Sequence, residues 1–79
     1  MTTYLTHWID GTAEETAHIC EDAAIDTAGA WCADEGADLV QFVNQPGHVR
    51  YRAMRDGKCI AIFSAMTMER PRNLAEACA

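Results

Sequence analysis

Apolar and polar positions alternate over much of the chain, and turn residues interrupt the alternation at several places. Residues 3–9 alternate between two faces and are rich in β-formers, which predicts a strand. Tyr4 and Trp8 share one face of this strand and are expected to pack in the core. Asp10 and Gly11 follow immediately and are expected to end the strand.

A helical period follows Gly11. Thr12 and Glu15 fit a capping box, which predicts a helix over residues 13–35 with Gly36 just beyond its end. A stripe of small residues, which would let the helix lie close to a sheet, recurs at steps of three and four and ends on one large side chain. The stripe consists of Ala13, Ala17, Cys20, Ala24, Ala28 and Trp31, flanked by Ile25 and Cys32.

Alternation returns in the second half and predicts a three-stranded meander over residues 38–44, 48–55 and 58–65. Pro46–Gly47 separates the first two strands, and Asp56–Gly57 is a strong signal for a type I′ hairpin turn. Residues 66–79 are interpreted as a C-terminal tail, with a short helix from Asn73 onward as one alternative.

Two-residue turns at both places define a register for the meander. The face expected to meet the helix collects Val40, Phe42, Val49, Tyr51, Ala53, Ile60 and Ile62. The opposite face collects Leu39, Gln41, Val43, Arg50, Arg52, Met54, Cys59, Ala61 and Phe63. This second face is too apolar for a solvated surface and too basic for a core, so either the tail or a partner is expected to cover it.

Together these elements predict an α+β fold formed by a single domain over residues 1–79, because a chain of 79 residues cannot form two cores. The expected order is β-α-β-β-β, with one long helix packed on a four-stranded antiparallel or mixed sheet. No run of about 18 apolar residues occurs, and the first residues lack the basic and apolar regions of a signal peptide. We therefore expect a cytoplasmic protein.

Charge is distributed very unevenly along the chain. The first 49 residues contain nine carboxylates and no Lys or Arg, and the last 30 contain all six cations and three acids. A segment of formal charge −9 thus precedes one of +3. Such a charge distribution is informative about binding partners but not about the fold. The acidic half favours a basic protein surface as the partner.

The predicted helix contains no cation, and some of its acids lie on an outward arc. The predicted partner-binding residues are Glu14, Glu15, Ile19, Asp22, Asp26, Asp34 and Glu35. A solvated acidic face that serves solubility alone explains the same pattern. Carboxylates scattered along one helix do not enclose calcium, so no metal site is expected.

A second candidate is the basic face of the meander. Its predicted interface residues are Arg50, Arg52, Met54 and Phe63, because Arg, Met and Phe are enriched at the centres of interfaces. This alternative describes a small homodimeric adaptor or interaction module. A weak nucleic-acid-binding domain is a further alternative, although the net charge of −6 argues against direct binding of DNA.

No catalytic motif, cofactor motif or paired metal ligand occurs in the sequence, so we expect a protein that is not an enzyme and needs no cofactor. The four cysteines stand at positions 20, 32, 59 and 78, without a Cys-x-x-Cys pair. Free thiols are expected for the first three. An intermolecular disulfide through Cys78 remains open.

The short acidic chain, with its strand, its long Ala-rich helix and its Pro46–Gly47 and Asp56–Gly57 meander, resembles the small anti-CRISPR proteins of phages and prophages. It is most similar to inhibitors of type I systems, with type I-C inhibitors as the narrower alternative. The resemblance covers the whole chain through size and architecture, without a diagnostic motif.

This resemblance implies an inhibitor that binds the CRISPR surveillance complex in a host bacterial cell and keeps target DNA away. The partner would be a basic DNA-binding surface of a Cas subunit. Some members mimic DNA with carboxylates, which would correspond here to Glu14, Glu15, Asp22, Asp26, Asp34 and Glu35. The basic face at Arg50 and Arg52 departs from a pure DNA mimic.

Overall fold

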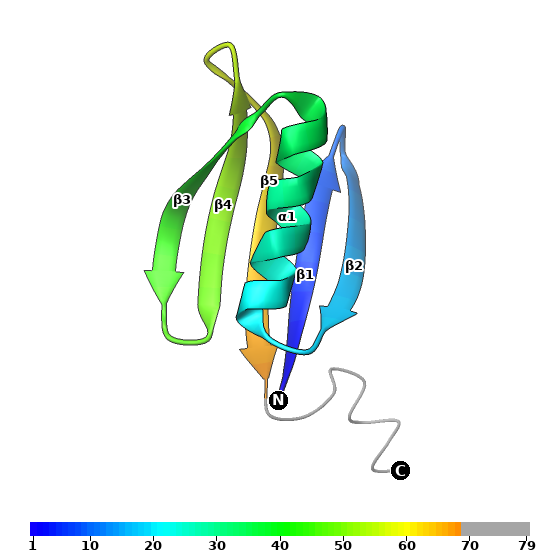
Figure 1. The fold of residues 1–79 in the computed structure, drawn as a ribbon, viewed down its shortest axis with the longest axis vertical. Helices are drawn as coiled ribbons and strands as arrows, with labels where there is room; N and C mark the ends of the chain where they lie inside the picture. The colour runs from blue at the N-terminus through cyan, green and yellow to red at the C-terminus, as the bar shows by residue number, and fades with distance from the viewer. Residues whose placement is uncertain (69–79) are drawn as a thin grey trace.

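The computed structural model describes residues 1–68, which form a five-stranded antiparallel sheet with one helix across one of its faces (Figure 1). The strand order in the sheet is β2-β1-β5-β4-β3. The elements are β1 (Thr2–Ile9), β2 (Thr12–His18), α1 (Glu21–Glu35), β3 (Asp38–Gln45), β4 (His48–Arg55) and β5 (Lys58–Met68). The α+β prediction is confirmed, but the sheet has five strands rather than four and the order is β-β-α-β-β-β.

The extra strand, β2, occupies residues for which the sequence predicts the first turns of the helix. Asp10 and Gly11 have φ values of 50° and 78°, the left-handed pair that a type I′ hairpin requires. The turn folds β2 back on β1, and seven residue pairs join the two strands. The helix start predicted from the capping box was therefore wrong. Local helix propensity contributes little free energy, and pairing along a whole strand outweighs it.

The helix is consequently shorter than predicted, but its end is where the sequence places it. It begins after Cys20, whose side chain makes no capping hydrogen bond, and it ends at Glu35. Gly36 has a φ of 66°; its N–H bonds the carbonyl of Ala33 at 3.4 Å, and the N–H of Ala37 bonds that of Cys32 at 2.8 Å. This is a Schellman motif, and the predicted glycine cap is confirmed.

The meander strands match the prediction closely, yet their register changes partway along. Near the turns the expected partners are present, with Met54 opposite Cys59 and Val43 opposite Arg50. An irregularity then places Ala53 opposite Ala61 rather than Ile60. A second irregularity, at Phe42, places Gln41 opposite Tyr51. Each inserts one extra residue, as in a β-bulge.

A one-residue shift moves every later side chain to the other face of a sheet. Phe63 and Ala61, predicted on the outer face, are buried beneath the helix. Val40 and Phe42, predicted in the core, are exposed instead, and Ile62 pairs with Trp8 and Arg52 on that outer side. Trp8 was also predicted in the core, but it is 36% exposed.

The core lies between α1 and the middle of the sheet. Two residues of the predicted stripe, Ala24 and Ala28, are buried on the helix together with the flanking Cys32. Cys20 is exposed just before the helix, and Ala13 and Ala17 lie on exposed β2. Phe63 is 1% exposed and is the largest fully buried side chain of the described residues. Small side chains on the helix permit the close approach of α1 to β5. The short helix predicted from Asn73 and the intermolecular disulfide considered for Cys78 concern residues outside the described range.

Candidate interaction surfaces

The helix presents two carboxylates to solvent on one line. Asp22 and Asp26 are both exposed and lie four residues apart, so they occupy the same face of α1. Ile19, just before the helix, is 84% exposed. We call these three residues the acidic helix patch. It combines two charges with an exposed apolar side chain, a combination that a protein partner can recognise.

Glu14 and Glu15 do not belong to this patch, although the sequence predicts one continuous helical arc. Both lie on β2, where neighbouring side chains point to opposite faces of the sheet. Glu14 lies beside His7 and Trp31 on the helix side, whereas Glu15 pairs with Thr6 on the side away from the helix. The prediction that these acids form a single arc on one helix was therefore wrong.

Asp34 and Glu35 stand at the other end of α1, about 18 Å from Asp22 at 1.5 Å per residue. Arg55 neutralises Glu35: its Nη1 lies 3.6 Å from the carboxylate and donates a 2.8 Å hydrogen bond to the backbone carbonyl of the same residue. The cation thus offsets the negative end of the helix dipole. Within the described part of the chain, Asp22, Asp26 and Asp34 have no cationic partner.

Two further basic side chains, Arg50 and Arg52, lie on the opposite side of the sheet. The guanidinium of Arg50 is 5.7 Å from the ring centre of Trp8 and 5.4 Å from that of Phe42, and that of Arg52 is 4.3 Å from Phe42. We call these four residues the aromatic–arginine face. Cation–π contacts of this kind hold the guanidinium groups in place without neutralising their charge.

None of the described elements covers this face, because α1 packs on the other side of the sheet (Figure 1). Phe42 is 37% exposed and Val40 is 47% exposed. The Nε of Arg50 is buried without a hydrogen-bond partner. Of the predicted alternative interface, Arg50, Arg52 and Met54 do lie on this side, and Phe63 does not.

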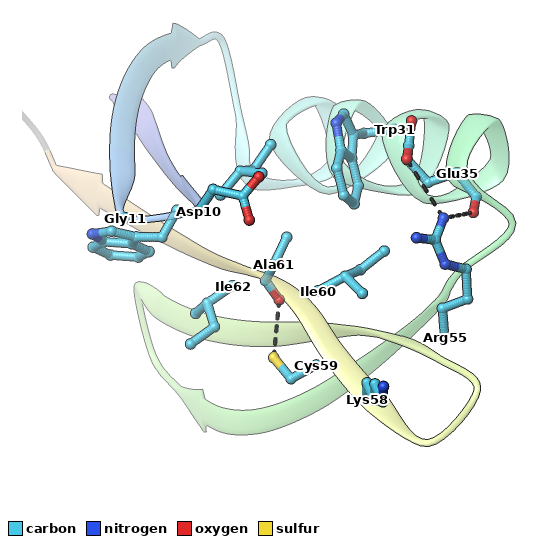
Figure 2. A pocket seen from close by; sticks show the side chains of 12 residues that line it. Asp10, Gly11, Trp31, Glu35, Arg55, Lys58, Cys59, Ile60, Ala61 and Ile62 are labelled. Atoms are coloured by element: carbon cyan, nitrogen blue, oxygen red, sulfur yellow. Dashed lines mark hydrogen bonds and ion pairs between the residues drawn. The ribbon is translucent and has the colours of Figure 1, made fainter.

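A cleft of about 480 Å³ opens where β5 extends past β1. The pairing of the two strands ends at Trp8 and Ile62, so the first residues of β5 extend beyond their pairing with β1. Figure 2 shows Trp31 above the cleft, Ile60 below it, and Asp10 and Arg55 toward opposite ends. Its walls are mainly apolar, while its rim carries both signs of charge, from Asp10, Glu35, Arg55 and Lys58.

His7 lies in the core layer, stacked on Phe63 at 4.1 Å and in edge contact with Trp31 at 4.9 Å. Its Nε2 is buried without a hydrogen-bond partner. Burial lowers the pKa of His7 below its ordinary value of 6.5, and the charge of Glu14 opposes this effect. The fold therefore favours the neutral imidazole.

We expect the protein to lose stability as the pH falls through the ordinary histidine pKa of 6.5, because the unfolded chain then binds a proton that folded His7 resists. The loss begins near the unfolded pKa and stops below the folded pKa, since both states are protonated there. Urea unfolding across this range measures it. His7→Gln should remove the dependence and His18→Gln should keep it; an unchanged dependence in His7→Gln contradicts the assignment.

The cysteines of the described residues differ in exposure. Cys20 and Cys59 are exposed, whereas Cys32 is buried. Burial raises the pKa of the Cys32 thiol, and the charge of Asp38 raises it further, so this thiol is a poor nucleophile. Residues 1–68 contain no group of three His, Cys, Asp or Glu side chains placed to hold a metal ion. No helix among them is long and apolar enough to span a membrane.

Comparison of the chain with known protein families, curated proteins and solved structures gives no match.

Sequence reasoning missed two of the four residues of the aromatic–arginine face, Trp8 and Phe42. A signal for Trp8 was present: Asp10–Gly11 is the same dipeptide as Asp56–Gly57, and treating both as hairpins would have paired residues 12–18 with the first strand. Phe42 faces outward because of the bulge in β3. A bulge depends on contacts with the neighbouring strand, so the sequence carries no comparable signal for it.

Proposed function

We propose that this protein is a non-enzymatic inhibitor that docks on a basic protein surface through the acidic helix patch. In its specific form, the proposal is an anti-CRISPR protein that binds a Cas subunit of a type I surveillance complex and blocks target DNA binding. One observation carries the docking step: Asp22 and Asp26 are unpaired, while Arg50 and Arg52 lie on the far side of the sheet. The cations within residues 1–68 therefore leave Asp22 and Asp26 available to a basic partner.

The patch has the parts that a docking site needs. Exposed charges increase the association rate and select a partner of opposite sign. Ile19 lies three residues before Asp22 in the chain and adds an exposed apolar side chain just before the helix. Asp34 lies on the same helix and extends the negative field toward its C-terminal end. This arrangement supports binding to a surface rich in Lys and Arg, such as one that normally holds nucleic acid.

Reversal of the two charges tests the proposal. Asp22→Lys with Asp26→Lys should weaken binding to the surveillance complex at least about tenfold, because attraction becomes repulsion. The neutral pair Asp22→Asn with Asp26→Asn should weaken it less. Binding of the unaltered protein should also weaken as salt is raised, because surface charges are screened. Affinity is measured by surface plasmon resonance, and inhibition by target-DNA binding of the complex.

A matched control separates the effect of the altered site from the effect of the altered net charge. Asn44→Lys with Gln45→Lys changes the charge by the same amount as the neutral pair, but on the exposed end of β3. This control should bind normally. Full binding and inhibition by the charge-reversed protein would exclude the helix patch as the docking site. Absence of any binding of the unaltered protein to type I complexes would overturn the specific form of the proposal.

A further inference from the structure

We propose that the aromatic–arginine face binds single-stranded nucleic acid, with bases stacked on Trp8 and Phe42 and phosphates held by Arg50 and Arg52. The proposal does not depend on the docking of the acidic helix patch, since the two surfaces lie on opposite layers of the molecule. It rests on the arrangement of ring faces and guanidinium groups on the side of the sheet that no element within residues 1–68 covers.

The groups on this face match the repeating unit of a single strand. Each nucleotide offers a flat base and an anionic phosphate, and sequence-tolerant binders meet these with exposed aromatic rings and cations. Here Trp8 and Phe42 are 36% and 37% exposed, and the guanidinium of Arg50 lies near both rings. A guanidinium that stacks on a ring can still direct its N–H groups sideways to a phosphate.

The net charge of −6 does not describe this face. Asp22 and Asp26 are carried by α1 on the other layer, and Glu35 pairs with Arg55 rather than with Arg50 or Arg52. The acids on this side, Glu15 and Asp38, belong to the edge strands β2 and β3. Local potential, rather than total charge, determines where an anion binds.

Two other occupants fit less well. A face-to-face dimer would place Arg50 and Arg52 of one copy against the equivalent positive face of the other, and like charges brought together at an interface are costly. Duplex DNA is read by an element that enters a groove, whereas this face is a sheet surface with side chains lying on it. Single strands are bound on such surfaces because unstacked bases can lie flat against the rings.

The test uses the full chain and fluorescein-labelled oligonucleotides of ten thymidines or ten uridines. Fluorescence anisotropy should show saturable binding with a Kd below about 100 μM at low salt, with a slope of log K against log salt of about −1.4 for two phosphate contacts. Arg50→Gln with Arg52→Gln should weaken binding at least about tenfold, and Trp8→Ala should weaken it at least about fivefold. Circular dichroism confirms that each variant is folded.

Arg55→Gln with Lys58→Gln removes the same charge from outside the face and should leave the Kd within about twofold. Arg52→Gln alone gives a second measure if the double variant fails to fold, because Arg52 is exposed. The proposal is overturned if no binding occurs at about 200 μM protein, or if both double variants lose affinity equally. It is also overturned if light scattering shows a dimer that Arg50→Glu dissociates. The Asp22 and Asp26 variants should keep oligonucleotide binding, so this proposal and the docking proposal fail separately.

Discussion

Phe63→Ala is expected to destabilise the fold by about 3–5 kcal/mol, since it removes a buried aromatic ring and leaves a cavity. The ring stacks on His7 at 4.1 Å, lies 5.6 Å from the ring centre of Trp31 and is 1% exposed. A domain has roughly 0.05–0.15 kcal/mol of stability per residue, so the loss would consume much of what a short chain has. Urea unfolding followed by circular dichroism measures the change.

Phe42→Ala provides the matched control, because the same side chain is removed from an exposed site on the outer face. Its cost should stay below about 1 kcal/mol. Equal losses in the two variants would show that the register of β5 and β3 is not the one described. The comparison therefore tests the two bulges as well as the core, since the register expected without them exchanges the environments of Phe42 and Phe63.

Ala28→Leu is the second large expected effect, at about 1–3 kcal/mol of destabilisation. Ala28 is 1% exposed in the layer where α1 meets the sheet, so three additional carbon atoms have no space. Overpacking of this kind forces strained rotamers or moves the helix away from the strands. Thermal unfolding should show a lower midpoint.

Ala33→Leu gives the control on the exposed side of the same helix, where the expected change is within about 0.5 kcal/mol. Both changes have the same small effect on helix propensity, so the difference between them reports the packing alone. Similar midpoints for the two variants would contradict close contact between α1 and the sheet at Ala28.

The fold places the acidic helix patch and the aromatic–arginine face on opposite sides of the sheet. Asp22 and Asp26 are exposed on the helix, which covers one face of the sheet (Figure 1), and Arg50 and Arg52 of β4 lie over aromatic rings on the other face. One small domain therefore presents a negative and a positive face in opposite directions. Both proposals use this separation, with a basic protein surface for the helix and a single nucleic-acid strand for the sheet.

Turn chemistry was the most informative part of the sequence. Asp56–Gly57 and Pro46–Gly47 correctly predicted the meander, and the φ of 66° at Gly36 agrees with the predicted helix end. Such signals are local, because a left-handed backbone position favours glycine wherever it occurs. The predicted start of the helix was wrong because a capping box is also a local signal. It carries no information about the pairing of residues 12–18 with β1, which determines their structure.

By itself, the sequence determined the meander, the end of the helix, the α+β class and the strong separation of acidic from basic residues along the chain. Only the tertiary structure decided that residues 12–18 join the sheet and that Phe63 rather than Ile62 meets the helix. The physical reason is that turns and caps depend on neighbouring residues, whereas strand partners and bulges depend on backbone groups distant in sequence. A shift of one residue there moves a whole strand from one face to the other.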